Sequence, residues 1–164
     1  MSETQPTPEP VPAEAFPGVE SGIVVGVDGS EPARAALRYA ADLAPKLGLP
    51  LRALVVWDYP ALAWGDWYVP EEIERLEEGA KELARLEAAK LFPDGAPDWF
   101  EVATRQGGAA AQLVAASRQS EMLVVGSRGH GGFAGLLLGS VSSACAAHSH
   151  CPVLIVRPHH APAG

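Results

Sequence analysis

Short apolar runs bounded by glycine, proline or polar residues alternate along the chain with longer segments whose apolar residues recur every three or four positions. Solid apolar runs of this kind indicate strands buried on both faces, and the longer spacing indicates amphipathic helices. Strands that alternate with helices favour parallel pairing through right-handed crossovers. The pattern therefore predicts an α/β fold, a single open, doubly wound parallel sheet of five strands with helices on both faces.

The predicted elements follow one another without an internal repeat. The predicted strands are 23–27, 49–58, 97–106, 121–126 and 151–158. The predicted helices are 33–47, 71–91, 107–119 and 140–148. Ser30 is expected to cap the first helix and Gly48 to end it, while Pro45 weakens its last turn. The strand at 97–106 alternates apolar and polar residues, which indicates an edge position with one exposed face.

Composition limits the classes of function that the chain can have. Its 164 residues are 48% hydrophobic and carry a formal net charge of −8. This size suits one domain with a hydrophobic core. The negative charge argues against binding to nucleic acid or to an acidic membrane surface. No apolar run approaches the roughly 18 residues of a membrane span. We expect a disordered Pro/Glu-rich leader at 1–20, a folded domain at 21–158 and a short tail at 159–164.

Two cysteines, Cys145 and Cys151, are too few for a disulfide framework, and no basic region followed by an apolar signal segment opens the sequence. We therefore expect a cytoplasmic protein. With His148 and His150 the cysteines could be imagined as a zinc site. Their spacing lacks the paired CxxC of a zinc knuckle, so we expect a packed junction between helix and strand and no metal.

A glycine-rich segment, GSRGHGGFAGLLLGS at residues 126–140, links the fourth predicted strand to the last helix. In doubly wound sheets, ligands bind beyond the carboxyl ends of the strands. Gly126 and Gly129 let the main chain approach a ligand, with φ values that other residues avoid. The N–H groups that open the last helix attract anions. The segment thus predicts a phosphate site, and a flexible loop followed by a helix cap is the alternative.

Two common phosphate motifs are absent from the chain. No lysine follows Lys90, which excludes a Walker A motif here, and the turn after the first strand, VGVDGSEPA, lacks the pattern GxGxxG. The predicted phosphate site is therefore of another kind.

The segment GSRGHGGFAGLLLGS resembles the pattern of ATP-binding universal stress proteins: Gly, two residues, Gly, nine residues, then Gly-Ser or Gly-Thr. The stretches IVVGVDGSEPARAALRYAADLA, GGAAAQLV and HCPVLIVRP are similar to that family's first strand and helix, third-helix entry and closing strand. The resemblance covers roughly residues 21–158. It implies a Rossmann-like fold with strand order 3-2-1-4-5.

The resemblance also implies a set of site residues. The phosphate and ribose cradle would comprise Gly126, Gly129, Gly139, Ser140, Val141 and Ser142. The strand contacts would comprise Gly26, Val27, Asp28, Val56 beside adenine, and Val125 in the same slot. The three valines suit a flat base, and Asp28 would bind ribose or adenine or lie near Mg²⁺. Alternatively, Asp28 only forms the turn or caps the helix. Arg128 and His130 fall at variable positions of the motif, and a contact between Arg128 and phosphate is a hypothesis.

These observations favour a nucleotide-dependent regulatory module of the stress response that binds ATP, alone or with Mg²⁺, and hydrolyses it slowly at most. The chain lacks the P-loop lysine and shows no convincing pair of metal-binding carboxylates or water-positioning base. The alternatives are an adenylate-forming enzyme, whose HIGH and SGGxDS motifs are absent, and an interaction protein with an empty cleft.

Partners are predicted at two places. The apolar strand at 152–157 lies at the sheet edge in the family's order, so the resemblance implies a homodimer that pairs through it, unless the Pro-rich leader covers that edge. The aromatic stretch at 57–68 forms either a lid or docking face for an unknown protein, or packs over the second helix.

Overall fold

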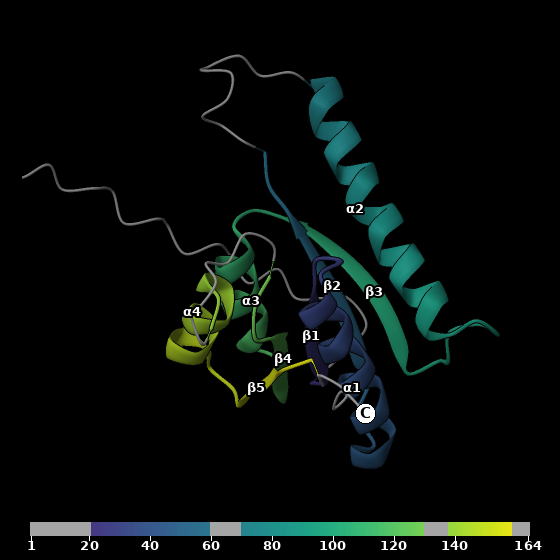
Figure 1. Cartoon of the computed structure of the whole chain (residues 1–164), viewed down its shortest axis with the longest axis vertical. Coiled ribbons are helices and arrows are strands. Elements are labelled where there is room, and N and C mark those ends of the chain that lie inside the picture. The colour runs from purple at the N-terminus through teal and green to yellow at the C-terminus, as the bar shows by residue number, and fades with distance from the viewer. Residues whose placement is uncertain (1–20, 60–69, 130–137, 159–164) are drawn as a thin grey trace, which may run out of the picture.

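The sheet and its helices follow the predicted alternation (Figure 1). The computed structural model describes residues 21–59, 70–129 and 138–158. The strands are β1 (Ile23–Val27), β2 (Leu51–Trp57), β3 (Phe100–Gln106), β4 (Met122–Gly126) and β5 (Val153–Val156). The helices are α1 (Glu31–Leu47), α2 (Pro70–Leu91), α3 (Ala109–Ser117) and α4 (Ser140–His148). The predicted leader, the tail and most of the aromatic stretch lie outside the described residues.

The strands form one parallel sheet in the order β3-β2-β1-β4-β5, which confirms the predicted fold and strand order. β3 and β5 are the two edges, as the alternating pattern of β3 indicated and as the family resemblance implied for β5. The order reverses direction between β1 and β4, so the carboxyl ends of these two strands flank the position where such sheets bind ligands.

Two apolar cores lie on opposite faces of the sheet, because successive strand side chains alternate between the faces. One core packs beneath α1 and α2 and includes Ile23, Val25 and Val27 of β1. The other packs beneath α3 and α4 and includes Val24 of β1 and Leu113 of α3. Figure 1 shows α3 and α4 side by side on one side of the sheet. Within the described ranges, no helix is both long and apolar enough to cross a membrane.

Most of the predicted boundaries are close, and the departures have local causes. α1 begins at Glu31, two residues before the first apolar position, because the N–H of Ala33 donates to Oγ of the cap Ser30 at 3.3 Å. β3 begins only at Phe100, because residues 97–100 form a turn in which the N–H of Phe100 donates to the carbonyl of Pro97 at 3.0 Å. α1 continues through Pro45 and ends at Gly48, whose φ of 67° is left-handed.

An ion pair joins the two helices that cover the first core. Glu87 of α2 is buried, and its carboxylate accepts Nε of Arg34 from α1 at 3.0 and 3.1 Å and Nζ of Lys90 at 3.0 Å. Burial by itself raises the pKa of Glu87, but the hydrogen bonds and charges of Arg34 and Lys90 outweigh it, so this pKa lies below its ordinary value. The carboxylate therefore stabilises the folded state when it is ionised.

The substitution Glu87→Gln is expected to lower the free energy of unfolding by about 1–3 kcal/mol at neutral pH, because Arg34 loses its charged partner. A group whose pKa is depressed by folding stabilises the fold above its unfolded pKa, about 4.3 for glutamate. This stabilisation is lost as the pH falls through the lower folded-state pKa. Urea melts between pH 3 and pH 7 should show the two proteins converging toward acid.

The exposed pair of Arg85 and Glu82, which lies on the same helix, provides the control. Glu82→Gln should change the free energy of unfolding by less than about 0.5 kcal/mol. An equal loss in both variants, or a Glu87→Gln deficit that persists unchanged at pH 3, would show that the buried pair does not act through its charge.

Candidate functional site

A pocket opens at the carboxyl end of the sheet, at the reversal between β1 and β4. It encloses about 500 Å³, a volume that includes the open space at its mouth. Its lining comes from three strands and three helices that are distant in sequence, and from the loops that follow β1 and β4. The lining residues are Gly26, Val27, Asp28, Ala33, Leu54, Val56, Ala109, Leu113, Val125, Gly126, Arg128, Gly129, Val141 and Ser142. Nine of the eleven predicted site residues are among them, and Gly139 and Ser140 are not.

The inner part of the pocket is apolar and lies on the face covered by α3 and α4. Val56, Val125 and Val141 belong to the core of that face or pack against it. Val27 lines the pocket and also belongs to the core under α1 and α2. The apolar slot on the side of α3 and α4 is lined by Val56, Val125, Leu54 and Leu113.

The outer part of the pocket is bordered by the N-terminus of α4. Gly139 is the N-cap and supplies no side-chain hydrogen bond, so the first N–H groups of the helix have no intrahelical acceptor. Val141 and Ser142 of this turn line the pocket, and Ser140 is exposed beside it. The resulting partial positive charge suits an anion, and the cationic residue Arg128 is also part of the lining.

Hydrogen bonds to Ser127 join the two ends of the glycine-rich segment. The carbonyl of Ser127 accepts the N–H of Gly139 at 2.8 Å and lies 2.9 Å from Oγ of Ser142, which donates to it. The hydrogen of the Ser142 hydroxyl is therefore directed to the main chain and not to a ligand. Its oxygen lone pairs and its N–H group are what it can offer to the pocket.

The glycines of the segment are required for close packing rather than for unusual φ values. Positive φ among the described glycines occurs at Gly29, Gly48, Gly95 and Gly107, so the prediction of such angles at Gly126 and Gly129 is wrong. A Cβ atom at Gly126 would lie 2.6 Å from the carbonyl carbon of Pro32 in the first turn of α1. A Cβ atom at Gly129 would lie 2.7 Å from Oδ2 of Asp28.

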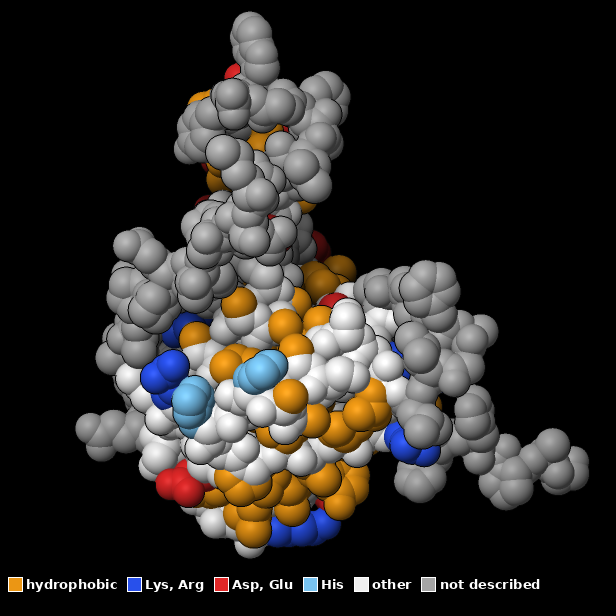
Figure 2. Space-filling view, turned by 90° about the vertical axis from the view of Figure 1, so that its left-hand side faces the viewer, with side chains coloured by type: hydrophobic (Ala, Val, Ile, Leu, Met, Phe, Trp, Pro, Cys, Tyr) orange, Lys and Arg blue, Asp and Glu red, His pale blue; other side chains and the backbone are white. Residues whose placement is uncertain are grey.

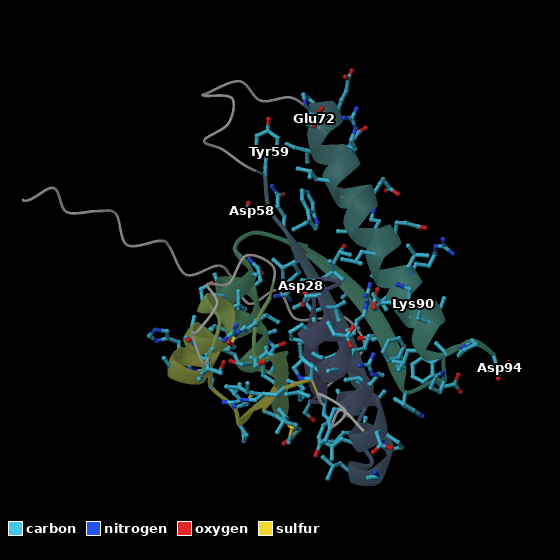
Figure 3. The ribbon with its side chains drawn as sticks, in the orientation of Figure 1. Asp28, Asp58, Tyr59, Glu72, Lys90 and Asp94 are labelled. Carbon is cyan, nitrogen blue, oxygen red and sulfur yellow. The ribbon has the colours of Figure 1, made fainter. Side chains whose placement is uncertain are left out.

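Asp28 lies at the end of β1 and has a structural role besides its place in the lining (Figure 3). Its Oδ1 accepts the N–H of Ser30 at 2.9 Å and the hydroxyl of Ser30 at 2.5 Å. Asp28 thus forms the turn that precedes α1, which was the alternative interpretation of this residue. Its Oδ2 lies on the side of Gly129, 2.7 Å from where a Cβ atom of that residue would be.

Five lining residues were not predicted as site residues. Arg128 was only a hypothesis, and Ala33, Leu54, Ala109 and Leu113 were missed. Ala109 opens α3, whose N-cap Gly108 also lacks a side-chain hydrogen bond, so a second helix N-terminus borders the pocket. The two adjacent glycines before α3, at the carboxyl end of a predicted strand, were the signal that could have revealed it.

Cys145 is fully buried in the core beneath α3 and α4, and Cys151 packs half-buried against it. Burial, with a smaller effect of Cys151, raises the pKa of the Cys145 thiol to about 11. In the part of the chain that the structure describes, no three histidine, cysteine or acidic side chains gather in a way that could hold a metal ion. His130 lies outside the described residues.

Comparison with known proteins identifies the family. The model of the universal stress protein family matches residues 22–157, so the chain belongs to this family. A universal stress protein of Mycolicibacterium smegmatis is 37% identical over 144 residues, which are 83% of this chain and 45% of that protein. The chain therefore spans about half the length of the curated relatives it matches.

Solved structures show the same fold. A universal stress protein in complex with cAMP aligns with a TM-score of 0.61 at 23% identity, covering 86% of this chain and 99% of the other. A family member from Arabidopsis thaliana with AMP bound aligns with a TM-score of 0.54 at 18% identity, covering 85% and 93%. Relatives with this fold thus bind nucleotides.

The substitution Gly126→Ala is expected to lower the free energy of unfolding by about 1–3 kcal/mol, because the new methyl group meets the backbone of the first turn of α1. Chemical denaturation followed by circular dichroism would measure the change. Gly79→Ala is the matched control, since Gly79 lies within α2 with nothing within 4 Å of the added Cβ. It should stabilise the protein by about 0.5–1 kcal/mol. Equal effects at both positions would contradict the close packing at Gly126.

Proposed function

From its membership of the universal stress protein family, we propose that this chain binds ATP in the pocket and serves as a nucleotide-dependent regulatory module. The observation that carries the proposal is the composition of the pocket, which has an apolar slot on the inside and an uncapped helix N-terminus with Arg128 on the outside. An apolar slot suits the faces of a base, and helix N–H groups suit phosphate oxygens. Structures of relatives with AMP and cAMP support the same class of ligand.

In this proposal the base enters the slot between Val56, Val125 and Leu113, and the phosphates extend toward the N-terminus of α4. Gly129 has no side chain, which keeps the path between Asp28 and α4 narrow but open to a ligand. A triphosphate gains more than a monophosphate here, because its additional negative charges reach the helix N-terminus and the guanidinium of Arg128. We therefore propose ATP rather than AMP as the preferred ligand.

A magnesium ion would arrive with the triphosphate. Among the described lining residues, Asp28 is the acidic side chain, and it also accepts two hydrogen bonds from Ser30. Mg²⁺ beside nucleotides is usually held by one or two carboxylates together with phosphate oxygens and water. Asp28 is therefore the residue that we assign to the ion, whose role would be to neutralise phosphate charge.

Hydrolysis is proposed to be slow at most. The charged side chains in the described lining are Asp28 and Arg128, and the chain has no lysine after Lys90. Fast phosphoryl transfer needs several positive groups around the transferred phosphate and a group that orients water. Pyrophosphate release in the presence of ATP would instead support the alternative of an adenylate-forming enzyme.

We also propose that two copies of the chain pair through β5. Within one chain β5 is an edge strand that pairs with β4 on one side, so its other side is where a strand of a second copy would pair. A groove between this edge and α1 is lined by Glu31, Arg38, Tyr39, Leu154 and Val156, among others. Tyr39 is 50% exposed there. Figure 2 shows hydrophobic side chains gathered toward the lower end of the face that it presents. Relatives about twice as long as this chain have room for a second such domain, which supports a second copy as the occupant.

The substitution Ser140→Asp tests the phosphate end of the pocket. An acidic residue in the first helical turn is favourable for α4, so the melting temperature without ligand should stay equal or rise. The added charge should repel the triphosphate and weaken ATP binding by about tenfold or more, measured by isothermal titration calorimetry. Binding of AMP, with less negative charge, should weaken less.

Ala146→Asp adds the same charge at an exposed position six residues further along α4. This is about 9 Å along the axis, near the screening distance at physiological salt, so ATP affinity should stay within about twofold. Unchanged ATP affinity in Ser140→Asp would show that the phosphates do not bind at the N-terminus of α4. Failure of ATP to bind or to raise the melting temperature of the unmodified chain would leave the alternative of an interaction protein.

The substitution Tyr39→Glu tests the proposed pairing. A buried carboxylate in an apolar contact is costly, so the dimer should weaken by about tenfold or more in sedimentation equilibrium. Leu47→Glu is the control, because Leu47 also lies on α1, is 49% exposed, and does not line the groove. A monomeric mass for the unmodified chain, or equal weakening in both variants, would contradict pairing at this edge.

A further inference from the structure

A second cavity lies between α1 and α2, and it shares no lining residue with the pocket at the glycine-rich segment. It encloses about 500 Å³, a volume that includes the open space at its mouth. The lining residues are Arg34, Leu37, Arg38, Glu87, Lys90 and Leu91. Three of them are cations and one is an acid, in a chain whose formal net charge is −8. A concave surface with an excess of positive charge attracts anions.

Glu87 fixes the orientation of the guanidinium of Arg34. The Glu87 side chain is only 4% exposed, and its carboxylate accepts Nε of Arg34 at 3.0 and 3.1 Å and Nη2 at 3.0 Å. This contact uses one side of the guanidinium and leaves the edge formed by Nη1 and the second N–H of Nη2. Among the described residues, none accepts a hydrogen bond from Nη1. Because the Arg34 side chain is 36% exposed, this edge is available to a second oxyanion.

The other two cations also have N–H groups to offer. Lys90, labelled in Figure 3, donates one hydrogen bond from Nζ to Glu87 at 3.0 Å, and an ammonium group has three N–H donors. Nη2 of Arg38 donates to Glu31, which lies outside the cavity lining, at 3.2 Å. The side chains of Arg38 and Lys90 are both 58% exposed, so dissolved ions reach them. The two glutamates therefore accept only part of the hydrogen bonds that the three cations can donate.

We infer that this cavity binds a small oxyanion group with two negative charges, a phosphate monoester, between Arg34 and Arg38 on α1 and Lys90 on α2. One carboxylate faces three cations in the lining, and a doubly charged anion balances the two remaining positive charges. The planar guanidinium edge matches two oxygens of a phosphate, and the ammonium adds a point charge. The charge of Glu87 is already paired with Arg34 and Lys90, which limits its repulsion of the ligand.

Titration of the full chain with inorganic phosphate, followed by two-dimensional ¹H–¹⁵N NMR at constant ionic strength, tests this inference. The amide signals of residues 34–38 and 87–91 should shift along one saturable curve. Sodium chloride at the same ionic strength should not reproduce these shifts, because chloride lacks the second charge and the paired oxygens. The signals of residues 139–143 report separately on phosphate at the N-terminus of α4.

The substitution Lys90→Gln should weaken phosphate binding by about threefold to tenfold, because it removes one charge-assisted hydrogen bond while Arg34 still holds Glu87. Lys90 lies outside the lining of the nucleotide pocket and of the β5 groove. Arg38→Gln, on the other helix, should weaken phosphate binding to a similar extent.

Lys81→Gln is the matched control for Lys90→Gln. It removes the same charge from α2, where Lys81 pairs with Glu77 and Glu78. Lys81 lies nine residues before Lys90, about 13 Å along the helix axis and beyond the screening distance at physiological salt. Its phosphate affinity should therefore stay within about twofold of that of the unmodified chain.

Two further probes carry the same group and distinguish its source. Binding of a phosphoserine peptide at least about tenfold tighter than glycerol 3-phosphate would indicate a phosphorylated partner protein. Equal binding of the two would indicate a free phosphate ester, and either result supports the site. Shifts confined to residues 139–143, shifts reproduced by chloride, or equal losses in Lys90→Gln and Lys81→Gln would overturn the inference and leave the proposed nucleotide site intact.

Discussion

The first turn of α1 packs against the end of β4 so closely that position 126 has no room for a side chain. Much of the functional end of the molecule depends on this contact. It places the cap Ser30 and the turn at Asp28 beside the glycine segment, and it sets the carboxyl ends of β1 and β4 as the rim of the pocket. A side chain at position 126 would meet the carbonyl carbon of Pro32, so the first turn of α1 would have to shift away from β4.

The fold was predictable because its signals are local and repeated. Buried strands of apolar residues alternate with helices, and the first helix has a capping serine at its start and a glycine at its end. This alternation is what builds a parallel sheet. The boundaries were less predictable where a turn, rather than hydrophobicity, decides them. The hydrogen bond to the Pro97 carbonyl makes β3 begin three residues later than predicted. The φ of 135° at Gly107 is not helical, so α3 begins at Ala109 and not at residue 107. Such turns depend on single hydrogen bonds and φ angles that leave no periodic trace.

The candidate site shows a similar division. The resemblance located the pocket, but the physical reasons for individual residues differed from those expected. Strand alternation directs Val27 toward the opposite core, and the hydroxyl of Ser142 donates to the main chain of Ser127. Leu113 and Ala109 come from a helix that the glycine motif does not include, and only the packing of α3 across the sheet brings them to the slot. Side-chain partners of this kind follow from tertiary contacts, which a motif does not encode.

The short distance between the pocket and the β5 groove follows from the topology of the sheet. β4 lies between the reversal point, where the pocket opens, and β5, which forms the edge, so only one strand separates the two sites. In a sheet whose last strand lay further from the reversal, ligand and partner would be separated by several independently packed strands. Here the residue that follows β4 is bonded to both sites, since the N–H of Ser127 donates to the carbonyl of Val156, which lines the groove, and its carbonyl accepts the hydroxyl of Ser142, which lines the pocket.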